Sequence, residues 1–143
     1  TGWTAELVRE KLIAQPQFEP GCLFFAVHIA SGRAVATATA WRVRPGDRDE
    51  GHLHMVAALP DHRGRGLGRL VCLAALHYLR DHGFRSAALT TDDHRLAAIS
   101  TYLGLGFVPD YWEDQASDQR ARWSAVFRRL DERSHERRAR SGG

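Results

Sequence analysis

A glycine-rich loop between a strand pattern and a helix pattern constrains the fold of this chain more than any other feature. The stretch LPDHRGRGLGRLV, residues 59–71, brings three glycines and three arginines together. Before it, HLHMVAAL alternates as a strand does, until Pro60 ends the pattern. After it, apolar residues recur at helical spacing up to Gly83, a typical helix stop. The sequence therefore predicts a strand, a bare loop and a helix in direct succession.

The flanking patterns predict a mixed α/β domain. CLFFAVHIA and AVATATAW are rich in strand formers and are separated by the turn SGR, so they predict an antiparallel hairpin. Strands and helices then alternate, which predicts a mixed sheet covered by helices in three layers, an α/β (α+β) fold class. Strands are predicted at 22–30, 34–41, 52–59, 84–91 and 107–112, and helices at 4–13, 67–83, 95–106 and 117–130.

Length and composition indicate one globular domain. Of the 143 residues, 43% are hydrophobic and 26% are charged, the balance of a packed protein. We expect a single domain over residues 1–130 and a basic, flexible tail over 131–143. No apolar run approaches the roughly 18 residues of a membrane helix, and no signal peptide is evident. A cytoplasmic location without a membrane partner is expected, with Cys22 and Cys72 as buried thiols.

The net charge of +3 does not predict nucleic-acid binding. Many basic residues fall in RARWSAVFRRLDERSHERRAR, residues 120–140, where acidic residues are interleaved with them. No aromatic platform or known reading motif accompanies them, so a solvated helix explains the pattern better. No nucleic-acid partner is expected, while the oligomeric state, a homodimer included, stays open.

The glycine-rich loop has the features of an anion site. Gly64, Gly66 and Gly68 carry no Cβ, so backbone N–H groups can converge on one concavity. The helix behind them begins with unpaired N–H groups and the positive end of its dipole. A phosphate or pyrophosphate suits such a site best, whereas a turn that merely joins a strand to a helix needs one glycine. Three arginines add mobile positive charge: Arg63, Arg65 and Arg69.

Two common nucleotide-binding motifs do not match this loop. The P-loop of nucleotide triphosphatases ends in Gly-Lys-Ser/Thr, but Gly68 is followed by Arg69 and Leu70. The dinucleotide fingerprint needs Gly-x-Gly-x-x-Gly and an acidic ribose ligand, whereas residues 64–68 have the spacing Gly-x-Gly-x-Gly. The triphosphate interpretation therefore fails, and the dinucleotide interpretation is weak.

The loop instead resembles the signature of the GNAT superfamily of N-acetyltransferases. RGRGLG, residues 63–68, matches Arg/Gln-x-x-Gly-x-Gly/Ala and follows a strand that ends in VAALP. The later block LTTDDHRLAAISTYLGLGFVPDY is similar to a second family segment, in the right order and at the right separation. The resemblance covers residues 22–112. It implies a GNAT-like acyl-CoA N-acyltransferase fold with a mostly antiparallel sheet and a central strand splay, whose first family strand is absent here or lies upstream.

The resemblance also implies an activity. Relatives transfer acetyl from the co-substrate acetyl-CoA to a primary amine by direct attack in a ternary complex, so a small-molecule or peptide amine is the expected partner, with no metal. A non-catalytic acyl-CoA-binding or sensing domain is the alternative. The cofactor-binding positions that the resemblance implies are Met55, Val56, Ala57 and Ala58 for the pantetheine arm, Arg63, Gly64, Arg65, Gly66, Leu67, Gly68 and Arg69 for the pyrophosphate, and Asp93, Arg95, Ala98 and Tyr102 in the second block.

Tyr102 occupies the position of the tyrosine that protonates the departing thiolate in many relatives, and a ring that only packs in the core is the alternative. For the amine, Glu50, His52 and His54 share one strand face at period two, and relatives often carry an acidic residue near His52. An alkyl ammonium is neutral in about one molecule in two thousand at pH 7, so one of these side chains is expected to act as base or relay. Surface or packing histidines are the alternative. A metal at His-x-His would need further ligands, and the sequence identifies none.

The second block departs from the family at Arg95, where many relatives have an asparagine that touches the pantetheine or the thiol. Either Asp92 or Asp93 provides that polar contact, or Arg95 reaches a phosphate. The chain also ends in a predicted helix where relatives commonly have a last hairpin strand, so the acceptor pocket is the least determined part. Two interpretations remain for a group of aromatic and acidic residues near the expected acceptor pocket. They form an aromatic wall whose acidic neighbours attract a cationic amine, or they belong simply to a solvated acidic loop. The residues are Trp41, Tyr111, Trp112, Asp110, Glu113 and Asp114.

Overall fold

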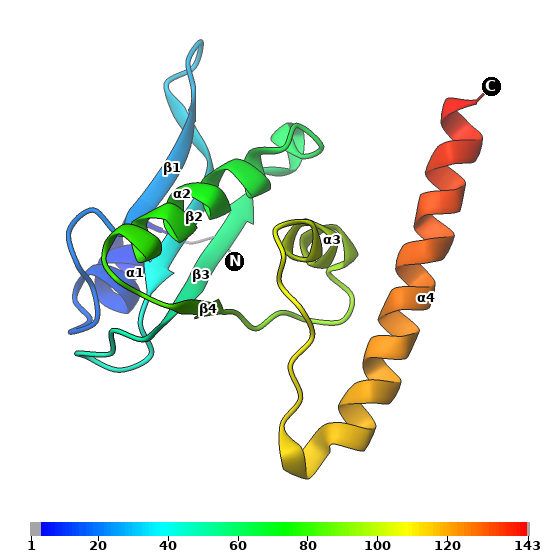
Figure 1. The fold of residues 1–143 in the computed structure, drawn as a ribbon. Coiled ribbons are helices and arrows are strands. Elements are labelled where there is room, and N and C mark those ends of the chain that lie inside the picture. The colour runs from blue at the N-terminus through cyan, green and yellow to red at the C-terminus, as the bar shows by residue number, and fades with distance from the viewer. Residues whose placement is uncertain (1–3, 143) are drawn as a thin grey trace. The chain divides into compact units, whose positions relative to one another are not determined.

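The computed structural model describes residues 4–142 and divides at Leu89 into two compact units. The first unit carries a four-stranded sheet in the order β1-β2-β3-β4, with antiparallel β1/β2 and β2/β3 pairs and a parallel β3/β4 pair. This mixed sheet confirms the predicted fold class and the predicted hairpin. Its elements are α1 (Ala5–Val8), which continues as a π-helical turn (Arg9–Ile13), β1 (Leu23–His28), β2 (Arg33–Trp41), β3 (Glu50–Ala58), a 3-10 turn (Pro60–His62), α2 (Leu67–Asp81) and β4 (Ser86–Ala88) (Figure 1).

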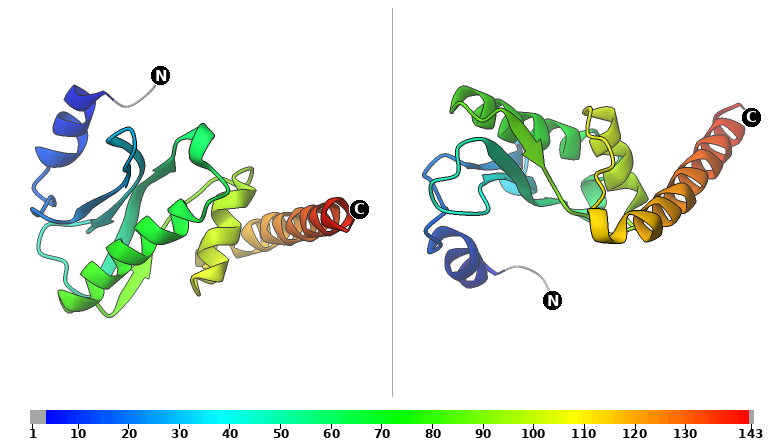
Figure 2. Two further views of the ribbon diagram at one scale, coloured as in Figure 1. Left: turned by 90° about the horizontal axis from the view of Figure 1, so that it is seen from above. Right: turned by 60° about the horizontal axis from the view of Figure 1, so that its bottom comes forward.

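Helix α2 covers one face of this sheet and forms the main core with it. Small buried side chains of β2, Ala36, Ala38 and Ala40, line that face, which lets α2 approach closely. The approach is closest at Gly51, where an added Cβ would lie 2.4 Å from Cδ2 of the buried Leu79. Helix α1 lies on the opposite side of the sheet in both views of Figure 2. Burial of each large apolar side chain in this core contributes about 1.5–3 kcal/mol.

A partly buried polar cluster closes the end of the sheet near the C-terminus of α2. The guanidinium of Arg42, 7% exposed, pairs with Glu19 at 2.7 Å and lies 5.4 Å from the ring centre of Phe84. The Tyr78 hydroxyl donates to the other Glu19 oxygen at 3.2 Å. Burial and the adjacent Glu19 carboxylate raise the pKa of Tyr78. The cluster ties the loop before β1, the end of β2 and α2 together, and nothing in the sequence pattern predicted it.

The second unit is helical. It contains α3 (Leu96–Gly104), a 3-10 turn (Glu113–Gln115) and the long α4 (Ala116–Ser141). Ser100 and Leu103 of α3 line a shared hollow with Leu130 of α4, and Val126 is buried. Helix α4 continues through residues 131–141, where the sequence suggested a flexible tail. Residues 1–3 of the predicted domain and Gly143 of the predicted tail lie outside the described residues, and a single domain over 1–130 stays a prediction.

The predicted strand at 107–112 is wrong. These residues belong to no helix or strand of the described chain. Val108 is 79% exposed, and Pro109 has no N–H to give to a strand ladder. The strand predicted at 84–91 is also shorter, since β4 spans Ser86–Ala88. Apolar and aromatic composition predicts a tendency to extend, but a strand forms only where a neighbouring strand pairs with it.

Two smaller expectations can be compared with the described residues. Cys22 and Cys72 are free and buried, as predicted, and burial raises the pKa of the Cys72 thiol to about 11. Neither thiol is therefore a reactive thiolate at neutral pH. Between residues 4 and 142, each helix is too short or too polar to span a membrane.

Candidate functional site

Strand β3 has an open side along most of its length. Strand β4 pairs with it at Glu50, Gly51 and His52, and β2 lines its other edge up to Ala58. Within residues 4–89, no other strand pairs with the remaining residues of β3 on this side, as Figure 1 shows. Backbone groups on that side lack sheet partners and need another hydrogen-bond partner. An extended ligand with amide groups can supply it as an added strand does.

A β-bulge lies in this open part of β3. Thr37 pairs with Ala57 and Thr39 pairs with His54, so Met55 and Val56 together face a single β2 residue. Met55 has φ +52°, a left-handed conformation that costs a side-chain-bearing residue about 1–2 kcal/mol. Regular pairing on both sides of the bulge holds this strained geometry. Strain of this kind is concentrated where a strand must turn a peptide group toward a ligand.

The glycine-rich loop follows β3 directly and leads into α2. Gly64 and Gly66 have φ +77° and +75°, which favours glycine at both positions. A Cβ at either position, or at Gly68, would meet nothing within 4 Å, so packing does not explain these glycines. The first bond of α2 runs from the Leu70 N–H to the Gly66 carbonyl at 3.0 Å. The N–H groups at the start of α2 therefore lie outside the hydrogen-bond ladder of the helix, at the positive end of the helix dipole.

The three loop arginines differ in their contacts. Arg63 turns back, and its Nε donates to the Ala58 carbonyl at 3.3 Å, which fastens the loop to the end of β3. Arg65 and Arg69 are exposed, and the first turn of α2 contains no acidic residue. The unit thus presents exposed cations and helix amides together, the chemistry that binds a phosphate.

Glu50, His52 and His54 lie on the sheet face away from α2, since the intervening residues Gly51 and Leu53 are buried on the α2 side. His52 Nε2 lies 3.3 Å from a Glu50 carboxylate oxygen. The His54 ring lies 5.5 Å from that of Trp41. Burial of part of the ring, and then the neighbouring His52, lower the pKa of His54. His54 is therefore held in the neutral form, which can accept a proton.

The candidate residues of the second block belong to the second unit. Tyr102 of α3 is buried, and its ring meets that of Phe107 edge-on at 6.2 Å. Ala98, one turn earlier on α3, is half-buried. Asp93 accepts two hydrogen bonds from Arg122, each 2.9 Å long, and these bonds lower the pKa of Asp93. Arg95 pairs with Asp92 at 3.2 Å, so both aspartates have partners within this unit.

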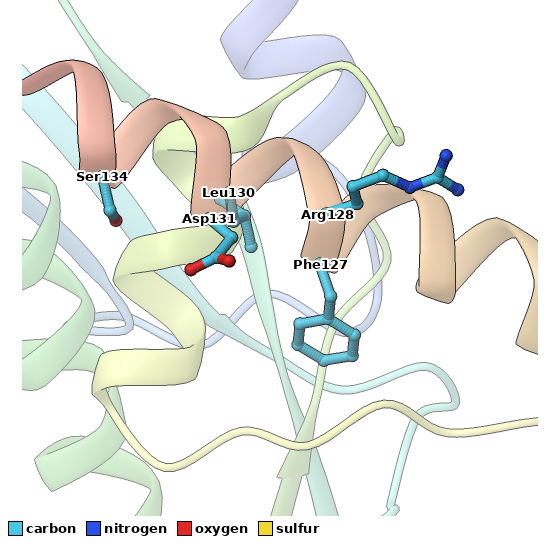
Figure 3. Close-up of a pocket in the computed structure, with 5 residues that line it drawn as sticks. All are labelled: Phe127, Arg128, Leu130, Asp131 and Ser134. Carbon is cyan, nitrogen blue, oxygen red and sulfur yellow. The ribbon is translucent and has the colours of Figure 1, made fainter.

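A hollow along α4 does not have the form of a ligand site. It is lined by Phe127, Arg128, Leu130, Asp131 and Ser134 (Figure 3). All five residues belong to α4, so the hollow has one wall and cannot enclose a small molecule. Across the described part of the chain, no three His, Cys, Asp or Glu side chains are grouped closely enough to hold a metal ion.

Comparison with known sequences identifies one family and a set of relatives. The model of the acetyltransferase (GNAT) family matches residues 2–107. A mycothiol acetyltransferase of Rhodococcus opacus (strain B4) is 38% identical over 108 residues, which are 73% of this chain and 35% of the relative. The chain thus spans about a third of the length of the curated relatives it matches.

Comparison with solved structures finds the same fold. A protein of Agrobacterium tumefaciens str. C58 that is assigned as an acetyltransferase matches with a TM-score of 0.58 and 29% identity, over 78% of this chain and 76% of that one. The yncA protein of Salmonella typhimurium, assigned as an acetyltransferase and solved with its cofactor acetyl-CoA, matches with a TM-score of 0.52 and 24% identity, over 60% of this chain and 49% of that one.

Proposed function

The chain belongs to the acetyltransferase (GNAT) family, and we propose that it transfers an acetyl group from acetyl-CoA to a primary amine of a small molecule or peptide. One observation carries the proposal. The bulged strand β3, which along most of its length is paired on one edge only, leads into the loop of Gly64 and Gly66, both at positive φ. The loop leads into the exposed N-terminus of α2. A ligand with an extended diamide arm and a pyrophosphate fits this succession, and coenzyme A has both.

The backbone of β3 and the loop would hold the cofactor. The pantetheine amides would pair along the open side of β3, at residues 55–58. The pyrophosphate would accept hydrogen bonds from loop and helix amides at residues 64–68, with Arg63, Arg65 and Arg69 supplying positive charge. The structure of yncA with acetyl-CoA supports this assignment through the shared fold.

We assign deprotonation of the amine to the row of side chains on β3. The amine reaches the site mainly as an ammonium ion, and the neutral His54 would take its proton, directly or through water. Glu50 would hold the His52 ring, with which it pairs at 3.3 Å. The free amine then attacks the thioester carbonyl carbon, so that a nitrogen–carbon bond forms and the carbon–sulfur bond breaks. No metal is required for this step.

We assign protonation of the departing thiolate to Tyr102. The assignment rests on its place in the second motif block, because Tyr102 belongs to the second unit. A phenol ordinarily titrates near pH 10, close to an alkyl thiol, so the transfer costs little free energy once the two groups are within hydrogen-bond reach. Asp93, Arg95 and Ala98 of the same block stay predicted cofactor contacts.

The acceptor is proposed as a small-molecule amine. Two relatives that are 38% identical to this chain are named mycothiol acetyltransferases, so amines related to mycothiol are the first to test. Trp112 is 61% exposed beside Glu113 and Asp114, which supports a surface that attracts a cationic amine. Arg120 lies over the Tyr111 ring at 5.5 Å and offsets part of that negative charge. The cytoplasmic location, the absence of a nucleic-acid partner and a homodimer stay predictions.

The proposal is tested by release of coenzyme A. The chain is incubated with acetyl-CoA and with mycothiol-related amines, aminoglycosides and peptides with free N-termini, and free thiol is measured. Release that depends on one amine class supports the proposed enzyme. Binding of acetyl-CoA without release for any amine supports the alternative, a non-catalytic acyl-CoA-binding domain.

A further inference from the structure

Two histidines from distant parts of the first unit meet beside the glycine-rich loop. His28 is the last residue of β1, and His62 ends the 3-10 turn directly before Arg63 and the loop. Their ring centres lie 5.2 Å apart with the planes tilted by 59°. Both side chains are half-exposed. The pair lies outside the proposed reaction chemistry, which uses the histidines of β3.

The surroundings of the pair are mostly basic. From the hairpin turn, Ser31 Oγ lies 2.7 Å from His28 Nδ1 and also accepts the Arg33 N–H at 3.4 Å. From β2, Arg33 stands opposite His28 in the strand register. Arg63 follows His62 directly in the chain, and the first turn of α2 contains no acidic residue. The nearest acid in sequence is Asp61, which is exposed.

This cluster of basic groups favours the binding of an anion. When His28 is protonated, Nδ1–H donates to Ser31 Oγ, since a hydroxyl oxygen can accept two hydrogen bonds. Nε2–H is then available for another acceptor. Two protonated rings at 5.2 Å repel each other and the nearby arginines. A phosphate group beside them relieves the repulsion and accepts charge-assisted hydrogen bonds.

We propose that His28 and His62 form a proton-linked phosphate subsite at the rim of the glycine-rich loop. The ligand is a phosphate of the nucleotide end of the acyl carrier, so the inference rests on the proposed function. No covalent step is involved: an imidazole nitrogen takes a proton from solvent as the anion binds, and the resulting N–H donates to a phosphate oxygen. Binding of the anion is therefore coupled to uptake of a proton.

The test is calorimetric titration of the chain with acetyl-CoA at pH 6.5 and pH 8.0, in two buffers of different ionisation enthalpy. The wild-type chain should bind about three- to tenfold more weakly at the higher pH, because each proton taken up changes affinity by at most tenfold per pH unit. It should also show proton uptake. His62→Asn should lose the uptake and bind at both pH values as weakly as the wild type does at pH 8.0.

Two further variants make the test specific. His62→Arg keeps a permanent charge, so it should bind at both pH values with the affinity that the wild type has at pH 6.5. His77→Asn removes an exposed histidine of α2 and should behave as the wild type. His28→Asn should repeat the loss seen in His62→Asn, with circular dichroism and thermal unfolding confirming that each variant is folded.

Dephospho-CoA, which lacks the 3′-phosphate, identifies the phosphate that is recognised. If His62→Asn weakens acetyl-CoA binding but not dephospho-CoA binding, the subsite holds the 3′-phosphate, and equal weakening assigns it to the pyrophosphate. Equal pH dependence in His62→Asn and His77→Asn overturns the subsite. No binding by the wild-type chain at either pH overturns the proposed function instead.

Discussion

Residues 4–89 and residues 90–142 are stabilised by different means. Among the described residues, twelve buried hydrophobic side chains belong to the first unit and three to the second. The first unit packs a sheet against α2, whereas the second unit consists of α3, α4 and their connections, with exposed ion pairs such as Asp93 with Arg122. The three buried hydrophobic residues of the second unit are Ile99, Tyr102 and Val126.

The difference bears on which chemistry each unit can supply. A packed sheet can hold a strained backbone, and the first unit holds Met55 at φ +52° and the loop glycines at positive φ. These are the main-chain features on which the proposed cofactor site depends. The second unit contributes side chains to the proposed reaction, Tyr102 above all. The comparison therefore predicts that changes in the loop and the packed core of the first unit act on cofactor binding and folding. Changes at Tyr102, as at His54 on β3, should act on the rate of transfer.

The largest effect is expected from Tyr102→Phe. Loss of a general acid lowers turnover by about 10²-fold or more, so kcat for the best amine should fall by that factor while KM for acetyl-CoA changes little. Steady-state release of coenzyme A measures both. Tyr78→Phe serves as the control in the first unit, because it removes the hydrogen bond to Glu19 and should leave kcat unchanged. An unchanged kcat in Tyr102→Phe would remove the second unit from the chemistry.

A pair of glycine substitutions compares the packing of the two units. Gly51→Ala places a Cβ 2.4 Å from the buried Leu79 side chain, and overpacking of this kind costs about 1–3 kcal/mol. Gly104 lies in α3, where a Cβ would meet nothing within 4 Å, so Gly104→Ala should add up to about 1 kcal/mol through helix propensity. Urea unfolding measures both free energies. Two changes of the same sign would contradict the described packing.

The smallest effect concerns pH. Because burial and His52 lower the pKa of His54 below the ordinary 6.5, the neutral base persists below that pH. The acidic limb of kcat/KM should therefore have its midpoint below 6.5 in the wild type, and activity should be lost as pH falls through it. His54→Gln should lower kcat/KM and remove this limb, and a limb that survives in His54→Gln assigns the base to another group. His52→Gln should keep this limb and move its midpoint upward, because the neighbouring His52 contributes to the lowered pKa of His54.

The elements set by local pattern could be predicted from the sequence. The hairpin of β1 and β2, the strand β3, the loop and α2 follow from alternation, turn residues and helical periodicity, each of which acts within a few residues. The helix predicted at 4–13 begins with a threonine, a common cap residue, and Thr4 Oγ1 accepts the Leu7 N–H at 3.2 Å. The anion-binding character of the loop stays a prediction, based on its three glycines, its arginines and the helix N-terminus behind it.

Features that depend on distant partners could not be predicted. The bulge at Met55 arises from the register of β3 against β2, and residues 107–112 lack the strand partner that their composition suggested. The pairs Glu19 with Arg42 and His28 with His62 join residues far apart in the sequence. Helix α4 extends through 131–141 although its sequence is mostly charged, and local apolar patterning gives no signal for such a helix.

The central claim is that the loop before α2 binds the phosphates of acetyl-CoA, and ligand-dependent unfolding tests it most directly. At about one hundred times its dissociation constant, acetyl-CoA should stabilise the wild-type chain by about 2.7 kcal/mol. Gly66→Ala and Gly46→Ala are matched, since both glycines have positive φ, +75° and +86°, and open surroundings. Both variants should lose similar intrinsic stability, but Gly66→Ala alone should lose the stabilisation by ligand. No stabilisation of the wild-type chain at millimolar acetyl-CoA, or equal stabilisation of both variants, would contradict the claim.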